Sequence, residues 1–385
     1  MTLRVGILAA EPSGDLLGAG LMQGLLAERS DLRFEGVGGP RMSACGLDSR
    51  IPMEKLSVMG LVEVLKHLPE LLRIRRDLLR YWLNDPPDLF VGVDAPDFNL
   101  KLEQRLRATG VPTVHYVSPT VWAWRPKRVI GLRRAADLVL SIFPFEQAFL
   151  DRHGVGSRYV GHPLAQEMPL SPDKAGGRDR LGLDAQAPVL ALLPGSRAGE
   201  VQALGRVFLA TAARVAEEIE GLQVITPLVN ARTRDQFESC RQECAPQLPV
   251  DLVLNDSRNV LAAADVVLTA SGTATLEALL SKRPMVVGYK VNAGTYWLAR
   301  ALRLVKVDHV AMANLLAGER LAPEFIQHEC RAERLAPEVV ALFRDSARVT
   351  AIQDRYRDIH RSMRIDTNRE AARAILDLLA EKGVV

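Results

Sequence analysis

The 385-residue chain lacks the features that would place it in several large classes of protein. It contains no apolar run that approaches the roughly 20 residues of a membrane-spanning helix. Charged and turn residues follow the first apolar segment too soon for a secretory signal peptide. The four cysteines show neither a zinc-binding nor a redox spacing. We therefore expect a cytoplasmic protein, at most peripheral on a membrane, with no metal and no other cofactor.

Aromatic residues and net charge are also scarce. Aromatic side chains make up 5% of the chain and do not alternate with basic clusters, and the formal net charge at pH 7 is only +3. Both observations argue against nucleic acid as a partner. The hydrophobic share of 48% and the charged share of 25% are ordinary for a globular protein. The length of the chain predicts two domains.

Apolar runs of strand length alternate with segments of helical period along most of the chain. Most of these runs are β-branched and apolar on both faces, as expected of parallel strands buried beneath helices. The alternation breaks across Gly161–Asp184, where Pro, Gly and charged residues concentrate. We predict an α/β fold of two doubly wound domains, about 1–165 and 166–340, that face each other across a cleft. A helical tail, 341–385, would pack across the domains or against a dimer partner. The predicted strands are Arg4–Ala9, Phe34–Val37, Leu89–Val93, Thr113–Val117, Leu138–Ile142, Val189–Leu193, Val224–Pro227, Asp251–Leu254, Val266–Thr269 and Met285–Tyr289.

Two strand-to-helix turns in the second half of the chain are the most informative local feature. Leu190–Arg197 (LALLPGSR) and Ser271–Ala278 (SGTATLEA) each join an apolar strand to a Gly/Ser/Thr turn that opens a helix. Such a turn directs free backbone N–H groups and the positive end of a helix toward an anion. Arg197 adds a permanent charge and a planar donor fork suited to phosphate, and Glu277 can accept hydrogen bonds from ribose hydroxyls. The pair predicts a bound nucleoside diphosphate; two ordinary turns that bind nothing are the alternative. The predicted nucleotide-binding residues are Gly195, Ser196, Arg197, Ser271, Gly272, Thr273 and Glu277.

Carboxylates follow two strands of the first half. Glu11, Ser13 and Asp15 come after the first strand, at the ligand-binding edge of an open α/β sheet. Ser13 or Asp15 could instead cap the next helix. Another strand leads directly into Asp94, which is well placed as a general base on an acceptor hydroxyl, and partial burial would raise its pKa to suit that role. Asp97 is the rival for this role, or caps the helix that follows.

The segment HYVSPTVWAWRPKR carries aromatic and basic residues to the same predicted edge. Trp122 and Arg125 would contact a charged, partly apolar substrate there, although the tryptophan could simply pack beneath the loop. His115 and His162 are candidates for acid–base chemistry or phosphate contact. A structural histidine is the alternative for each of them.

The segment Met59–Leu83 is rich in Val and Leu and is interrupted by Lys and Arg. An apolar wedge flanked by basic residues is typical of a helix that lies on an anionic membrane surface. A buried helix with a solvated basic face is the alternative.

Several of these segments together resemble one enzyme family. The motifs EPSGD, GVGGPRM, VMGLVEVL, GVDAPDFN, HYVSPTVWAWRPKR, GHP, LLPGSR, PLVNA, SGTATLEA, PMVVGYK and NLLAG, spread from the first strand to about Gly318, are similar to lipid-A-disaccharide synthases. The resemblance implies the GT-B architecture of two facing Rossmann-like domains. It also implies that Asp94 is the catalytic base, that Arg197 lies beside the pyrophosphate, and that Asn314 in NLLAG contacts substrate.

The activity that the resemblance implies is an inverting glycosyl transfer. UDP-2,3-diacylglucosamine would be joined to 2,3-diacylglucosamine 1-phosphate (lipid X), giving the β-1,6-linked tetraacyl disaccharide 1-phosphate and UDP. The family acts at the cytoplasmic face of the inner membrane and tends to form homodimers through C-terminal helices. A UDP-sugar epimerase or hydrolase on the same scaffold is the alternative. A non-catalytic nucleotide-binding adaptor is disfavoured by the acidic residues at Glu11, Asp15 and Asp94.

Overall fold

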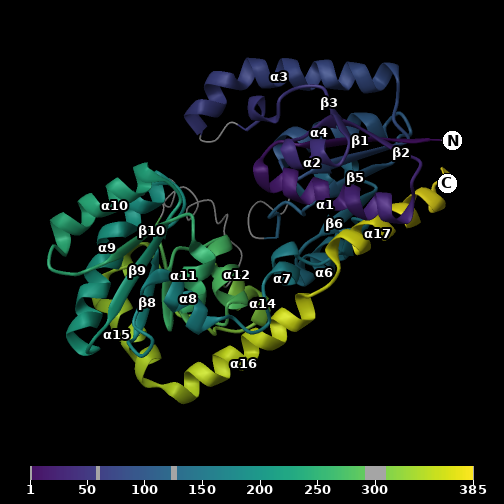
Figure 1. The fold of residues 1–385 in the computed structure, drawn as a ribbon. Coiled ribbons are helices and arrows are strands. Elements are labelled where there is room, and N and C mark those ends of the chain that lie inside the picture. Colours follow the sequence, from purple (N-terminus) through teal and green to yellow (C-terminus); the bar gives the residue numbers. More distant parts are fainter. Residues whose placement is uncertain (1, 58–60, 123–127, 291–308, 385) are drawn as a thin grey trace. The chain divides into compact units, whose positions relative to one another are not determined.

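The computed structural model describes residues 2–57, 61–122, 128–290 and 309–384; for residues 61–66 it describes the backbone only. The described chain divides into two compact units (Figure 1). The N-terminal unit comprises Met1–Gln166 together with Met363–Val385, and the second unit comprises Glu167–Ser362.

The N-terminal unit contains a parallel sheet whose seven described strands run in the order β3-β2-β1-β4-β5-β6-β7. This is the Rossmann order, in which the chain winds outward in both directions from the centre of the sheet. The strands are β1 (Leu3–Ala9), β2 (Leu32–Val37), β3 (Leu47–Ser49), β4 (Leu89–Val93), β5 (Thr113–Tyr116), β6 (Leu138–Ser141) and β7 (Ser157–Tyr159). The helices of this part of the chain are α1 (Pro12–Glu28), α2 (Pro40–Ala44), α3 (Leu61–Asn84), α4 (Pro96–Arg107), α5 (Val129–Ala135), α6 (Pro144–Arg152) and α7 (Pro163–Glu167), with a short 3-10 turn at Met53–Lys55.

The second unit repeats the same winding with six described parallel strands in the order β10-β9-β8-β11-β12-β13. The strands are β8 (Val189–Leu193), β9 (Gln223–Leu228), β10 (Asp251–Leu254), β11 (Val266–Thr269), β12 (Met285–Tyr289) and β13 (Glu324–Ile326). The helices are α8 (Lys174–Leu181), α9 (Ala198–Glu218), α10 (Ala231–Cys244), α11 (Ser257–Ala263), α12 (Thr273–Leu280), α14 (Met312–Ala317), α15 (Ala332–Arg344) and α16 (Ser346–Met363), with a 3-10 turn at Gln327–Glu329.

The two sheets confirm the predicted α/β class and all ten predicted strands, within one or two residues at each end. Three strands were missed: β3, β7 and β13. Each is three residues long and stands at an edge of its sheet, so it is too short to show an apolar period. The helical C-terminus is also confirmed, but its first helix begins at Ala332, and Pro337 lies inside that helix.

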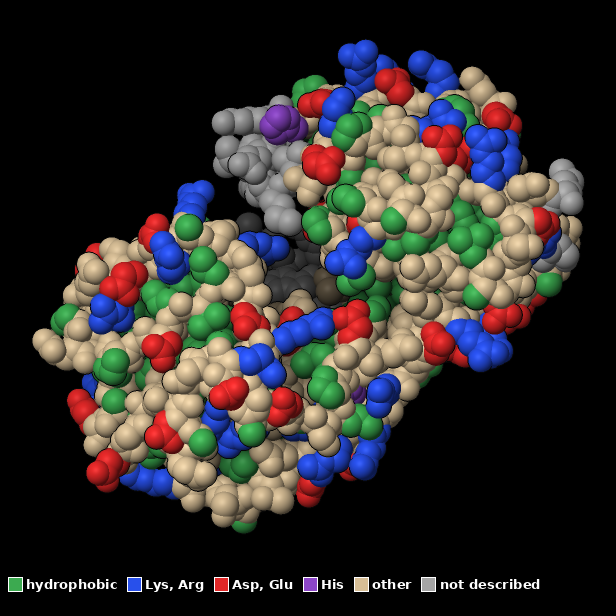
Figure 2. All heavy atoms as spheres, in the orientation of Figure 1, with side chains coloured by type: hydrophobic (Ala, Val, Ile, Leu, Met, Phe, Trp, Pro, Cys, Tyr) green, Lys and Arg blue, Asp and Glu red, His purple; other side chains and the backbone are tan. Residues whose placement is uncertain are grey.

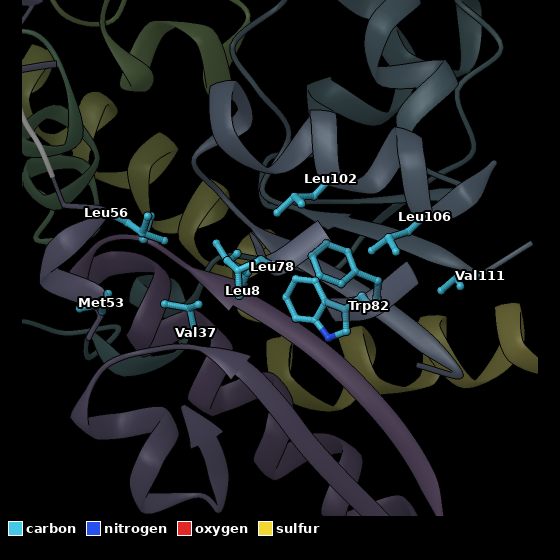
Figure 3. Close-up of a cluster of buried hydrophobic side chains, with 11 residues drawn as sticks. Leu8, Val37, Met53, Leu56, Leu78, Trp82, Leu102, Leu106 and Val111 are labelled. Atoms are coloured by element: carbon cyan, nitrogen blue, oxygen red, sulfur yellow. The ribbon is translucent and has the colours of Figure 1, made fainter. Parts of the chain in front are cut away.

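One buried hydrophobic cluster of the N-terminal unit lies between its sheet and the helices α3 and α4 (Figure 3). Trp82 of α3 lies at its centre, with no exposed surface, and packs edge-on against Phe90 of β4 at 4.8 Å between ring centroids. Its indole N–H donates to Glu35, which also pairs with Arg4. A buried indole N–H needs such a partner, because leaving it unsatisfied would cost as much as the lost hydrogen bond.

The last helix, α17 (Thr367–Glu381), returns to the N-terminal unit and packs along α1 (Figure 1). The contact depends on small residues: a Cβ atom at Gly24 would lie 2.3 Å from the carbonyl oxygen of Asn368. The buried face of α17 includes Ile375 and Leu379. The N-terminal unit is therefore built from two segments that are far apart in the sequence.

Candidate functional site

In the second unit, the two predicted turns leave neighbouring strands. The Gly195–Arg197 turn follows β8 and the Ser271–Thr273 turn follows β11, and β8 and β11 pair in parallel at the centre of the sheet. In a doubly wound sheet, the chain turns in opposite directions from such a pair of strands, and ligands bind in the crevice at their carboxyl ends. The topology therefore brings both turns to the edge where a ligand is expected.

Glycine shapes both turns. Gly195 has φ 117° and Gly272 has φ 127°, in a region that side-chain-bearing residues rarely adopt. No described residue comes within 4 Å of the position that a Cβ of Gly272 would occupy, so the backbone there has room for an incoming group. The turn is tied to the α14 segment, because the hydroxyl of Ser271 donates to the carbonyl of Val310 at 2.9 Å and the hydroxyl of Thr275 accepts from the Met312 N–H.

Two backbone N–H groups of the first turn already donate hydrogen bonds to a carboxylate of the protein. Glu200 Oε2 accepts from the backbone N–H groups of Ser196 and Arg197 at 3.0 and 3.1 Å. Sequence reasoning missed this residue, although a Glu at the third position of a helix is a known signal for such a cap. The Arg197 side chain is 74% exposed, and its guanidinium lies 3.8 Å from the Glu200 carboxylate. The guanidinium is therefore accessible to a ligand.

Glu277 lies one turn into α12 and is half-buried. Burial raises the pKa of its carboxyl, and the nearby charge of Arg258 partly opposes that effect. A half-buried carboxyl that faces a cation is a suitable acceptor for sugar hydroxyls. Thr273, at the start of the same helix, is exposed.

The structure does not support direct substrate contact by Asn314. This side chain is fully buried, and its amide is used inside the protein: Nδ2 donates to Ala322 and Glu324, and Oδ1 accepts from the Ala322 N–H. The carboxylate of Glu324 in turn accepts from the N–H groups of Val310 and Ala311. Asn314 thus supports the segment that holds Ser271 in place.

In the N-terminal unit, Glu11 and Asp94 also stand at the ends of neighbouring strands. Glu11 follows β1, Asp94 follows β4, and β1 and β4 pair in parallel. Glu11 occupies the N-cap position of α1, but its side chain makes no capping hydrogen bond there. Ser13 is exposed in the first turn of the same helix. The strand order therefore places these polar residues at one edge of the sheet.

Asp15 has a structural role that the sequence did not reveal. Its carboxylate is 3% exposed and accepts three backbone N–H groups, from Gly39, Arg41 and Met42, at 2.8 to 3.0 Å. These groups belong to the turn that opens α2, so Asp15 caps a neighbouring helix and not its own. The structure does not support direct substrate contact by this carboxylate, because its oxygens face the protein interior.

Asp94 has an unusual backbone. Its φ is 52° and that of Ala95 is 44°, so two consecutive residues without a glycine adopt the left-handed conformation. Such residues cost about 1–2 kcal/mol each and are concentrated at functional sites. Asp97, the rival candidate, has no such constraint: its side chain is 88% exposed, with Arg128 at 3.5 Å.

His115 is not at the edge of the sheet. It lies within β5, fully buried, and its Nδ1 is 2.7 Å from Oε1 of the equally buried Glu103 on α4. The structure therefore does not support acid–base or phosphate contact by His115. The ring of His162 packs beside Phe143 at 5.3 Å, and its Nδ1 accepts from the Leu164 N–H.

Trp122 lies partly buried at the end of the described part of its loop, and Arg125 lies outside the described residues. The Trp122 indole donates to Glu146 at 3.1 Å, and Glu146 also accepts from the Phe143 N–H. Burial raises the pKa of Glu146 to about 8, although both donors oppose that shift. Sequence reasoning missed this residue, because nothing in the sequence indicates that a helix-opening Glu is buried. Within the described ranges, no cluster of His, Cys, Asp and Glu could hold a metal ion.

The fold and the arrangement of turns define a class. Two parallel sheets of the Rossmann strand order, with helices around them, are the GT-B architecture found in glycosyltransferases and UDP-sugar epimerases. The fold resembles that of a Staphylococcus aureus MnaA structure with UDP (TM-score 0.64, 13% identity, 100% of this chain and 98% of that one). It also resembles WaaG, a glycosyltransferase of lipopolysaccharide biosynthesis (TM-score 0.53, 13% identity, 97% and 99%).

Sequence comparison identifies the family within this class. Residues 5–377 match the family model described as lipid-A-disaccharide synthetase. The chain is 52% identical over 380 residues to a lipid-A-disaccharide synthase of Pseudomonas aeruginosa, covering 99% of both chains. It is 48% identical over 376 residues to that of Serratia proteamaculans, covering 98% of both. The chain belongs to the lipid-A-disaccharide synthase family and is a glycosyltransferase of lipid A biosynthesis.

Proposed function

We propose that the protein joins UDP-2,3-diacylglucosamine to lipid X, with the donor nucleotide bound by the second unit and the acceptor bound by the N-terminal unit. The observation that carries this assignment is the division of residues between the two sheets. The central strand pair of the second unit ends in glycine turns with an accessible arginine. The central pair of the N-terminal unit ends in carboxylates.

Asp94 is the general base in this proposal. Its carboxylate takes the proton from the 6-hydroxyl of lipid X as that oxygen attacks the anomeric carbon of the donor sugar. The bond between the anomeric carbon and the UDP oxygen breaks on the opposite face, which inverts the configuration. Half-burial at a strand end and a constrained backbone favour Asp94 over the exposed Asp97 for this role.

Arg197 stabilises the charge that develops on the departing UDP. Its guanidinium is permanently charged and suits phosphate oxygens. The open backbone at Gly272 provides room for the phosphates, and Glu277 accepts from the ribose hydroxyls. The Glu200 carboxylate has to leave the Ser196 and Arg197 N–H groups if the diphosphate is to use them.

Contact with the membrane is a further part of the proposal. No helix among the described residues has the length and apolar character needed to cross a membrane. Leu68 and Leu72, one turn apart on α3, are nevertheless 40% and 44% exposed, whereas Leu78 and Trp82 farther along are buried in the core. Figure 2 shows basic side chains over the part of the unit where Figure 1 places α3. An exposed apolar face beside basic residues suits an anionic bilayer that holds the acyl chains of both substrates.

Self-association as a homodimer completes the proposal; the family resemblance of the chain supports it. Sedimentation velocity at several protein concentrations tests it directly. A monomer at every concentration would contradict it.

The decisive test of the reaction is UDP release from UDP-2,3-diacylglucosamine, measured with and without lipid X. We expect release to require lipid X and to match the amount of disaccharide formed. Release that ignores lipid X would indicate a hydrolase, and conversion of the donor sugar without release would indicate an epimerase.

The membrane contact is tested by replacing Leu68 and Leu72 with Ser. Each leucine contributes about 1.5–3 kcal/mol when fully inserted, so binding to anionic liposomes should fall at least about tenfold. UDP affinity should be unchanged. The matched control is Leu83→Ser, since Leu83 is 40% exposed at the far end of α3. Val62, Val64 and Leu65, in the first part of Met59–Leu83, have side chains outside the described residues. A folded double variant that binds liposomes like the parent would place membrane contact elsewhere.

A further inference from the structure

A buried amide lies directly beneath the turn that carries Asp94. Asn99, on the first turn of α4, has no exposed surface. Its Nδ2 is 2.8 Å from the carbonyl oxygen of Asp94, 3.3 Å from that of Val93 and 3.4 Å from that of Leu8. Three carbonyl oxygens surround this nitrogen, and they are acceptors for its N–H donors. The side chain thus binds the ends of β1 and β4 together at the point where Asp94 begins.

The turn above Asn99 needs such support. Asp94 and Ala95 have φ values of 52° and 44°, and neither is a glycine. The Asp94 N–H donates to the Tyr116 carbonyl on β5 at 2.8 Å, which fixes the turn from the other side. Left-handed backbone at residues with a Cβ persists only where neighbouring contacts hold it. The shortest bond of the Asn99 side chain, at 2.8 Å, reaches the carbonyl of Asp94 itself.

Asn99 belongs to a larger polar group between α4 and the sheet. Glu103 follows one helical turn later and pairs with His115 on β5, and both are fully buried. Gly92 on β4 leaves room for them, since a Cβ there would lie 2.0 Å from Glu103 Oε1 and 2.9 Å from Asn99 Cβ.

This polar group does not maximise stability. Among the described residues, Asn99 Oδ1, Glu103 Oε2 and His115 Nε2 are buried without hydrogen-bond partners. An apolar set of similar volume in such an interface is commonly as stable or more stable. The group therefore has a use other than stability, and the turn that it supports carries the proposed base.

We propose that Asn99 is a positioning residue: it holds the Asp94–Ala95 turn in its left-handed conformation and thereby directs the Asp94 carboxylate toward the acceptor hydroxyl. Glu103 and His115 fix the face of α4 that presents Asn99. This inference rests on the proposed role of Asp94 as the base. It assigns Asn99 no contact with either substrate.

The test replaces Asn99 with Asp, which keeps the size of the side chain but removes the N–H donors that face the three carbonyls. We expect kcat to fall roughly 10- to 100-fold, as for a reacting group displaced by about 1 Å. The KM for lipid X and the affinity for UDP should stay within about twofold, because Asn99 touches neither ligand. Thr113→Val is the control for the loss of a buried polar group. Thr113 is equally buried, but it lies at the start of β5, away from the Tyr116 end that contacts Asp94. It should lower the Tm and leave kcat unchanged at temperatures where the variant is folded.

A second variant separates positioning from folding. Ala95→Gly, added to Asn99→Asp, lowers the steric cost of the left-handed turn. If Asn99 acts by holding that turn, the double variant should recover a measurable part of the lost kcat. Loss of Tm with unchanged kcat in Asn99→Asp, or no recovery in the double variant, would overturn the proposal. Full activity of Asp94→Asn would instead overturn the proposed function, and the role of Asn99 with it.

Discussion

The carboxyl edges of the two sheets reach a left-handed backbone in different ways. After the central strand pair of the second unit, β8 and β11, the residues with positive φ are the glycines Gly195 and Gly272, at 117° and 127°. In the N-terminal unit, the residues after β4 and β5 are Asp94, Ala95 and Val117, at 52°, 44° and 77°. Glycine adopts such values freely, whereas the other three residues carry a steric cost.

The difference matches the two roles proposed for these edges. An edge that binds phosphates benefits from bare backbone, because a Cβ would occupy the space of the ligand, and Gly272 has that open space. An edge that performs proton transfer needs a functional side chain, so it must accept the strain of a side-chain-bearing residue. Under the proposed roles, the second unit is adapted to bind the nucleotide, and the N-terminal unit to hold one carboxylate in a fixed direction.

The strongest test of this comparison is Asp94→Asn. The variant should keep the fold and the UDP affinity, but its rate should fall about 10²–10⁴-fold, because the amide cannot take the proton. Turnover and UDP titration measure the two effects separately. Asp97→Asn serves as the matched variant. If Asp97→Asn lost turnover and Asp94→Asn kept it, the two roles would be exchanged.

The binding edge is tested by Arg197→Ala. Loss of a charge-assisted contact to the diphosphate should weaken UDP binding or slow turnover at least tenfold, on the order of 1.4 kcal/mol. Arg234→Ala is the control, since Arg234 in the same unit pairs with Asp235. Unchanged UDP affinity and turnover in Arg197→Ala would contradict the proposal that this turn binds the diphosphate.

Glu146 in the N-terminal unit and Glu200 in the second unit each cap the start of a helix that follows a strand. The two carboxylates differ in how deeply they are buried. Glu146 caps α6 from a buried position, whereas the Glu200 side chain is 31% exposed at α9. Burial raises the pKa of Glu146 to about 8, against 4.5 for a free carboxyl. Between these values the folded state keeps a proton that the unfolded chain has lost, so this group makes the protein less stable as the pH rises from 4.5 to 8.

Glu146→Gln should remove that contribution. The thermal midpoint of the variant, measured across this pH range, should fall less steeply with pH than that of the parent, by a few degrees. Parallel slopes for Glu146→Gln and the parent would show that Glu146 titrates in the folded state as it does in a free chain.

The smallest effect is expected for Ala95→Gly alone. Relief of the left-handed cost exceeds the added entropy of the unfolded chain, so the free energy of unfolding should rise by up to about 1 kcal/mol. The control is Ala27→Gly, in the exposed last turn of α1, which should lower it by about 0.5–1 kcal/mol. If chemical denaturation showed that Ala95→Gly lowers the free energy of unfolding as much as Ala27→Gly does, the Asp94 turn would store no strain.

These contrasts also mark what the sequence could reveal. The glycine turns were predictable, because the residue types themselves indicate an open backbone after a strand. The strained turn was not, since the letters VDAPDFN contain no glycine. The contacts that hold it, from the Asn99 side chain and from the Tyr116 carbonyl on a neighbouring strand, arise only in the fold. Burial of His115 was equally hidden, because a lone polar residue in an apolar strand reads the same whether its partner is Glu103 or a ligand.

The return of α17 to the N-terminal unit has a consequence for protein synthesis. The strands β1–β7 leave the ribosome first, yet the helix that covers α1 is made after the whole of the second unit. About 200 residues separate the two segments, so at 5–20 residues per second the nascent unit waits roughly 10–40 s with that side of α1 uncovered. The second unit is continuous in sequence and can fold during this interval. A chain that ends directly after α16 would contain the whole second unit beside an N-terminal unit that still lacks its last helix.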